Sequence, residues 1–160
     1  MHILIATDAQ WVLNEVQAAL DAPSTTFEVV TNGRNVATAV AERTPDIAIL
    51  DLQVGSMGGM AITMDLRLDE SSNSLPHVPI LMLLDRRADV HMARRSGADG
   101  WIIKPLDALR LRKAVRDIAA GGCYAEGLPV APDTDSNVDE ASSDDTNANA
   151  ETETADSLTS

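Results

Sequence analysis

Five short apolar runs alternate along the chain with segments whose apolar positions repeat at helical spacing. Continuous apolar runs of this length are typical of parallel strands that are buried on both faces of a sheet. The predicted strands are 2–6, 26–31, 46–51, 79–84 and 100–103. Because these strands alternate with helices, the pattern predicts an α/β fold with a doubly wound parallel sheet.

A predicted helix follows each strand. In the first helix, one face carries Val12, Val16, Ala19 and Leu20. The same periodicity predicts helices around 36–40, at 60–68, at 86–96 and after 107. Gly97 is a natural C-terminus for the fourth helix, and Asp107 can cap the fifth.

Three charged residues stand where predicted strands end. Asp8 follows the first strand, Asp51 ends the third and Lys104 follows the fifth. The carboxyl ends of parallel strands meet at the edge of the sheet where open α/β folds bind ligands. Two carboxylates and one ammonium group at that edge suit a metal ion and a phosphoryl group.

Charge divides the chain unevenly. The net charge is −13, but from Ala125 onward there are ten acids and no Lys or Arg, so the preceding part carries only −3. We therefore predict one domain over 1–122 and a disordered acidic tail over 123–160, which either solubilises the chain or contacts a basic partner. Neither part has the basic face that nucleic-acid binding needs.

Several features bear on where the protein works. The single Cys123 allows no internal disulfide and fits a reducing cytoplasm. The sequence begins directly at a strand, so we expect no signal peptide. No apolar stretch approaches the roughly 20 residues of a membrane span. We expect a cytoplasmic protein without direct membrane insertion.

Three stretches carry a resemblance to a known family: the run that ends at Asp51, the Gly58–Gly59 turn, and Ser96 to Pro105. Over about 2–121 the chain resembles the receiver domain of two-component response regulators. The resemblance implies a flavodoxin-like (βα)5 sandwich with strand order 2-1-3-4-5. It also implies that Asp51 accepts a phosphoryl group from a histidine kinase, with Mg²⁺ and Lys104 balancing the charge, and that the Lys104–Pro105 bond is cis.

The metal-binding part of the resemblance is incomplete. Most receivers carry two acids after the first strand, and here Thr7 precedes Asp8. The remaining expected ligands of Mg²⁺ are Asp8, Asp51 and the backbone carbonyl of Gln53. Since Mg²⁺ uses few carboxylates and several waters, we expect binding to be weaker than in the family.

The positions that, in the family, transmit phosphorylation to the protein surface also depart from the family pattern. Leu84 stands where receivers carry a Ser or Thr hydroxyl, and Trp101 stands where they carry Tyr or Phe. Asp85 replaces a small residue, and it either faces the site, where it would repel phosphate, or points to solvent. The fold and the acceptor aspartate remain, but we expect phosphorylation to be poorly coupled to a conformational change at positions 84 and 101. Asp51 therefore has two readings: a phosphoacceptor, or a structural carboxylate paired with Lys104.

Receivers commonly bind partners through the face formed by helix four, strand five and helix five. Arg94, Arg95 and Trp101 are the candidate partner-binding residues on that face, although the arginines, with Arg86 and Arg87, also suit a solvated surface. We expect the methionines of the domain to be core and loop fillers. They are Met57, Met60, Met64, Met82 and Met92.

The predicted function is that of a stand-alone receiver, not an enzyme, that works through protein–protein contact, largely without phosphorylation. The chain resembles single-domain orphan regulators of actinobacteria, which implies the proton-pumping NADH:quinone oxidoreductase (respiratory complex I) as a candidate partner at the inner face of the plasma membrane. The alternative is a conventional His–Asp phosphorelay receiver. A small enzyme or nucleotide binder is disfavoured, because the loop after the first strand has no glycine-rich phosphate cradle.

Overall fold

The computed structural model describes residues 1–127, and residues 128–160 lie outside the described part. One parallel sheet runs through the domain in the order β2-β1-β3-β4-β5-β6. Its strands are β1 (His2–Ala6), β2 (Thr26–Val30), β3 (Ile47–Asp51), β4 (Ile80–Leu84), β5 (Gly100–Ile103) and β6 (Tyr124–Ala125). The five predicted strands and their 2-1-3-4-5 order are confirmed.

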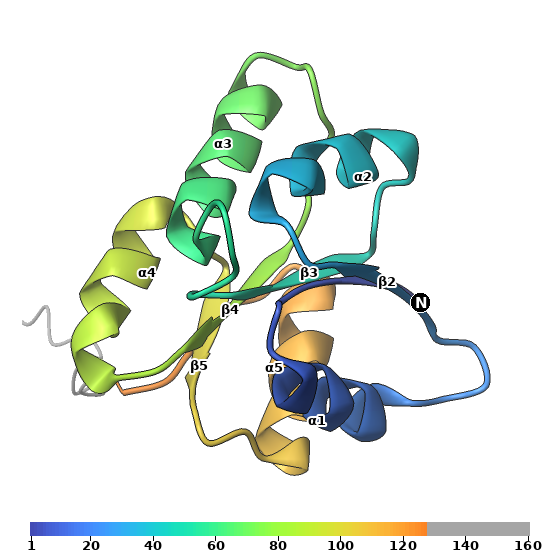
Figure 1. The fold of residues 1–160 in the computed structure, drawn as a ribbon, viewed down its shortest axis with the longest axis vertical. Coiled ribbons are helices and arrows are strands. Elements are labelled where there is room, and N and C mark those ends of the chain that lie inside the picture. Colours follow the sequence, from blue (N-terminus) through green and yellow to red (C-terminus); the bar gives the residue numbers. More distant parts are fainter. Residues whose placement is uncertain (128–160) are drawn as a thin grey trace, which may run out of the picture. The chain divides into compact units, whose positions relative to one another are not determined.

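Five α-helices cover the sheet, with α1 and α5 on one face and α2, α3 and α4 on the other (Figure 1). They are α1 (Gln10–Leu20), α2 (Val36–Glu42), α3 (Gly59–Ser71), α4 (Val90–Ser96) and α5 (Ala108–Ala119), with short 3₁₀ turns η1 (Gly33–Asn35) and η2 (Arg87–Asp89). Within residues 1–127, none of the helices has the length and apolar character needed to cross a membrane.

The core consists of two aliphatic layers because alternate strand residues point to opposite faces of the sheet. One layer packs strand residues such as Ile5 and Ile49 against α1 and α5. The other packs Leu4 and Leu50 against α2 and α3, and a smaller cluster around Leu84 lies beneath α4. With both faces covered, the four strands β1, β3, β4 and β5 are almost entirely buried.

The predicted helix ends are largely confirmed. Gly97 ends α4 in the left-handed region, with φ of 86°, where glycine carries no steric cost. Asp107 caps α5 by accepting hydrogen bonds from the backbone N–H groups of Leu109 and Arg110, at 3.0 Å each. The fourth helix begins later than predicted, because Arg86 is extended and a 3₁₀ turn precedes Val90.

The sixth strand continues the ordered domain beyond the predicted boundary at 122. Tyr124 and Ala125 of β6 pair with Gly100 and Trp101 of β5. Gly100 permits this approach, since a Cβ there would lie 2.5 Å from the Tyr124 carbonyl oxygen. Residues 123–127 therefore belong to the domain and not to the predicted acidic tail, whose remainder lies outside the described residues.

Candidate functional site

Asp51 is the last residue of β3, and only 2% of its surface is exposed. Its Oδ1 accepts hydrogen bonds from the Lys104 Nζ at 2.7 Å and from the backbone N–H of Gln53 at 3.2 Å. Its Oδ2 accepts one from the Thr7 hydroxyl at 3.0 Å. The structure thus brings together Asp51 and Lys104 as the strand ends predict, and both carboxylate oxygens are engaged. The Lys104–Pro105 bond is cis, as the resemblance implies.

Lys104 is shared between two carboxylates. Its Nζ also lies 3.0 Å from Asp85 Oδ1, so Asp85 faces the site, and the alternative that it points to solvent is wrong. The other oxygen of Asp85, Oδ2, is buried and has no hydrogen-bond partner in the described part of the chain. Sequence reasoning missed Trp11, a half-exposed residue in the first turn of α1 whose ring centroid lies 5.4 Å from Nζ. The signal for Trp11 in the sequence was its place three residues after Asp8, which puts it in the first turn of the helix beside the site.

Asp8 lies at the solvent-exposed mouth of the site. Its carboxylate borders the loop after β3, because a Cβ on Gly55 would lie 2.9 Å from Asp8 Oδ2. Asp8 and Asp51 offer the hard oxygen ligands that Mg²⁺ prefers, so the donor type fits this ion. Among residues 1–127, however, no cluster of three or more His, Cys, Asp or Glu side chains could hold a metal ion. An ion here would depend on these two carboxylates, backbone oxygen such as the Gln53 carbonyl, and water.

Two positions of the site carry residues that differ from the family pattern. Thr7 is buried, accepts a hydrogen bond from the Ala9 N–H at 3.1 Å and directs its own hydroxyl hydrogen to Asp51. Thr7 therefore orients the acceptor carboxylate and adds no charge. Leu84 is fully buried against Val90 and Trp101 and brings no polar atom to the site.

Trp101 is held inward by the C-terminal segment. Only 5% of its surface is exposed, and its Nε1 donates a hydrogen bond to the Glu126 carbonyl oxygen at 2.8 Å. The Glu126 carboxylate accepts from the Ile103 N–H at 2.7 Å and pairs with Arg110. This burial removes Trp101 from the surface predicted to bind partners, because β6 and Glu126 cover the indole. Arg94 and Arg95 of that patch are exposed on α4.

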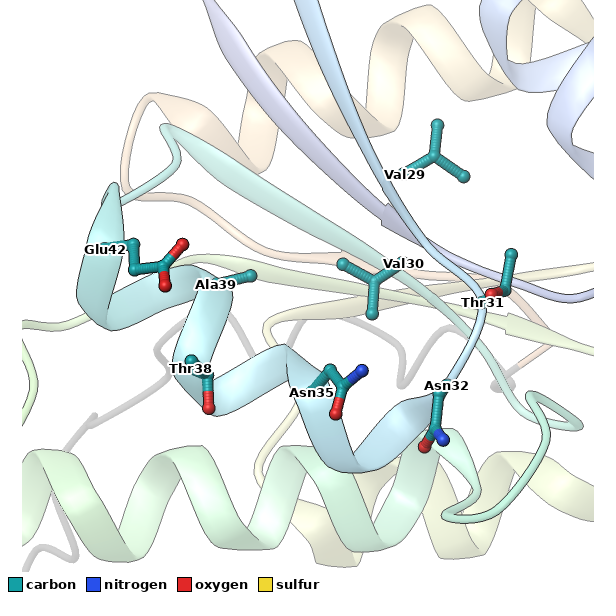
Figure 2. Close-up of a pocket in the computed structure, with 8 residues that line it drawn as sticks. All are labelled: Val29, Val30, Thr31, Asn32, Asn35, Thr38, Ala39 and Glu42. Atoms are coloured by element: carbon teal, nitrogen blue, oxygen red, sulfur yellow. The ribbon is translucent and has the colours of Figure 1, made fainter.

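A separate pocket of about 340 Å³ lies between the end of β2 and α2, away from the acceptor (Figure 2). Its lining residues are Val29, Val30, Thr31, Asn32, Asn35, Thr38, Ala39 and Glu42. Figure 2 shows Glu42 at one end of the lining and Asn32 at the other. Glu42 is the single ionisable group of this lining.

Together, the doubly wound sheet and the Asp51–Lys104 pair at its carboxyl edge define a receiver-type fold. Residues 3–116 match the family model for the response regulator receiver domain, and the chain belongs to this family of signalling domains.

Individual relatives agree with this assignment. The chain is 29% identical over 137 residues to the transcriptional regulatory protein CseB of Streptomyces avermitilis, covering 84% of this chain and 56% of that one. It spans about half the length of the curated relatives it matches.

Solved structures are similar in fold. A response regulator structure from Chloroflexus aurantiacus has a TM-score of 0.67 at 21% identity, covering 74% of this chain and 97% of that one. The receiver domain of a Pseudomonas aeruginosa sensor histidine kinase has a TM-score of 0.65 at 18% identity, covering 74% and 97%. Its structure contains a magnesium ion in the active-site cleft.

Proposed function

We propose that this chain is an atypical receiver that acts through protein–protein contact, largely independently of phosphorylation. The observation that carries the proposal is the state of the acceptor. Both oxygens of Asp51 are engaged, and the single ammonium of Lys104 is divided between Asp51 and Asp85. An attacking oxygen would first have to leave one of these hydrogen bonds.

Charge opposes the addition of a phosphoryl group. Asp51 and Asp85 already place two carboxylates on the one ammonium of Lys104. At about 4 Å, two like charges near a protein surface repel by roughly 4 kcal/mol. Mg²⁺, if bound through Asp8, Asp51 and the Gln53 carbonyl, would supply the charge neutralisation that phosphoryl transfer needs. With fewer carboxylates than the family pattern, we expect this binding to be weak.

The route from phosphate to a conformational change is also interrupted. Leu84 has no hydroxyl to donate to a phosphoryl oxygen, and it belongs to the same buried cluster as Trp101. The indole is already buried and held by Glu126, so it has no inward movement left to make. A phosphoryl group on Asp51 would therefore have little effect on the surface of α4 and β5.

A conventional phosphorelay receiver is the second candidate function. The retained Asp51–Lys104 pair, with 2.7 Å between carboxylate and ammonium, favours it, since this is the pair that accepts and stabilises a phosphoryl group in the family. In that case a histidine kinase would be the partner, and Asp51 would be the nucleophile.

Respiratory complex I is the partner that we propose for the chain, placing it at the inner face of the plasma membrane without insertion. The support is the resemblance to orphan actinobacterial regulators. Co-purification of the tagged chain from native membranes should recover subunits of the proton-pumping NADH:quinone oxidoreductase. If the tagged chain is recovered without those subunits, complex I is not its partner. The proposal that the chain acts through protein–protein contact would still stand.

Intact-mass measurement after incubation with acetyl phosphate and Mg²⁺ tests the main proposal. Attack by Asp51 on phosphorus would release acetate and add one phosphoryl group. We expect the wild-type chain to be labelled at least about tenfold less than Leu84→Thr/Asp85→Ala, in which a hydroxyl returns and a carboxylate is removed.

The added substitution Asp51→Asn should abolish labelling of the double variant, which identifies the acceptor. Equal labelling of wild type and double variant would contradict the proposal and favour the phosphorelay alternative.

A further inference from the structure

An apolar groove of about 430 Å³ lies between α3 and α4, next to the acceptor site. These two helices are neighbours on the same face of the sheet (Figure 1). The residues that form its apolar floor and one end are Leu52, Met60, Ala61, Met64, Met92 and Arg86. Neither Asp51 nor Lys104 lines the groove, but Gln53, whose carbonyl oxygen is an expected Mg²⁺ ligand, lies at its edge.

Two methionines of the groove are exposed on helices, whereas the sequence predicted core and loop fillers. Met64 is 51% exposed and Met92 is 44% exposed, whereas Met82 is fully buried. Leu68, at 65% exposure, extends the same stripe on α3, because residues 60, 64 and 68 recur at helical spacing. Clustered exposed apolar side chains mark interaction sites, and methionine adapts its shape to a partner.

The segment on the α4 side of the groove is basic. Residues 86–96 carry four arginines, Arg86, Arg87, Arg94 and Arg95, against a single acid. That acid, Asp89, is buried and paired with Arg86, so it adds little negative charge to the surface. Arg94 and Arg95 are exposed along α4, where Arg95 lies one turn beyond Met92. On the α3 side of the groove, Asp65 is an exposed acid in the middle of the helix.

We infer that this groove docks an acidic segment of a protein partner, which inserts aliphatic side chains among Met60, Met64 and Met92 while its carboxylates meet Arg86 and Arg95. The apolar floor supplies affinity through buried area, and the arginines supply orientation and electrostatic attraction. An amphipathic helix with one apolar and one acidic face matches both features. The inference rests on the proposed function only in that the chain acts by protein contact, and it does not depend on the state of Asp51.

Methionine methyl signals provide a direct test in the full chain. The chain has six methionines, so ¹³C-methyl labelling gives few signals. The probe is a helical peptide with leucines on one face and glutamates on the other. We expect Met60, Met64 and Met92 to shift together and to saturate, while the buried Met82 and the distant Met1 stay unchanged. A matched peptide with lysines in place of glutamates should cause no shift.

Variants sharpen the result. Arg95→Ser should weaken binding about tenfold, and Met64→Glu should weaken it at least as much. Leu109→Glu is the matched control, since Leu109 is 75% exposed on α5 and should leave binding unchanged. Binding that persists in Asp51→Asn separates this inference from any result on phosphorylation.

Several outcomes would overturn the inference. They are the absence of shifts, equal shifts of Met1, or equal binding of the lysine peptide. Shifts that appear with protein concentration alone would assign the groove to a second copy. Shifts that depend on salt but not on concentration or peptide would assign it to an acidic segment of the same chain.

Discussion

The two halves of the acceptor pocket differ in kind. The strands β3 and β5 supply Asp51 and Lys104, the pair on which the receiver family depends, while β1 and β4 supply Thr7, Leu84 and Asp85, which do not match the family pattern. The first half contains a buried ion pair, and losing one partner of such a pair leaves an uncompensated charge. The positions of the second half can change without that penalty. The ammonium of Lys104 is therefore expected to be required for stability whether or not Asp51 is phosphorylated.

The largest effect should come from Lys104→Ala. This change leaves Asp51 and Asp85 facing each other without a countercharge, so the free energy of unfolding should fall by about 3–5 kcal/mol. Urea denaturation at neutral pH measures the loss. Asp51→Asn is the matched control, because it removes one of the two repelling carboxylates.

The double variant Asp51→Asn/Lys104→Ala should recover part of the stability that Lys104→Ala loses. Purely additive effects of the two changes would show that the pair contributes nothing to stability. The two halves of the pocket would then not differ in their importance for stability.

A smaller change is expected for Thr7→Asp, which restores a carboxylate to the second half. The added hard ligand should raise the affinity for Mg²⁺ about tenfold. Trp11 reports on the site because its ring lies over Lys104, so a Mg²⁺ titration can be followed by its fluorescence. Trp101→Phe in all samples leaves Trp11 as the single tryptophan of the chain.

Thr7→Asn serves as the uncharged control for this titration and should not raise the affinity. If Thr7→Asp and wild type bound Mg²⁺ equally, the missing acid at position 7 would not be what limits the affinity for Mg²⁺.

The smallest effect is expected for Trp11→Ala. A cation–π contact at a half-exposed ring contributes about 0.5–1 kcal/mol, so the free energy of unfolding should drop by that amount. The loss should vanish when Lys104 is already replaced by alanine, and thermal or urea denaturation of the four-variant cycle measures this coupling. An equal loss in both backgrounds would assign the effect to packing of the ring.

Most of the fold could be predicted because the apolar pattern of each strand and the residues at the helix ends are consistent with the same parallel sheet. The strand runs are apolar on both faces, which only a sheet covered by helices on both sides satisfies, and Gly97 and Asp107 end and begin helices as their chemistry predicts. The strand β6 escaped prediction. It has only two residues, Tyr124 and Ala125, and its pairing depends on the space left by Gly100.

The site was predictable in part. Strand ends of a parallel sheet meet at one edge, so the meeting of Asp51 and Lys104 follows from sequence order. The direction of Asp85 does not, because the residue after a strand can turn either way, and Lys104 as its partner lies 19 positions away. The exposure of Met64 and Met92 also depends on how α3 and α4 pack, which helical spacing within each segment leaves open.

The sequence alone determined the class of fold, the acceptor pair and the chemical departures at Thr7, Leu84 and Asp85, since residue identity and strand order suffice for these. Tertiary structure decided how those residues share their charges, because hydrogen bonds and ion pairs join atoms that are distant in the chain. It also decided that Trp101 is buried under Glu126 and that methionines line an open groove. Burial is a property of packing between elements, and periodicity within one element cannot specify it.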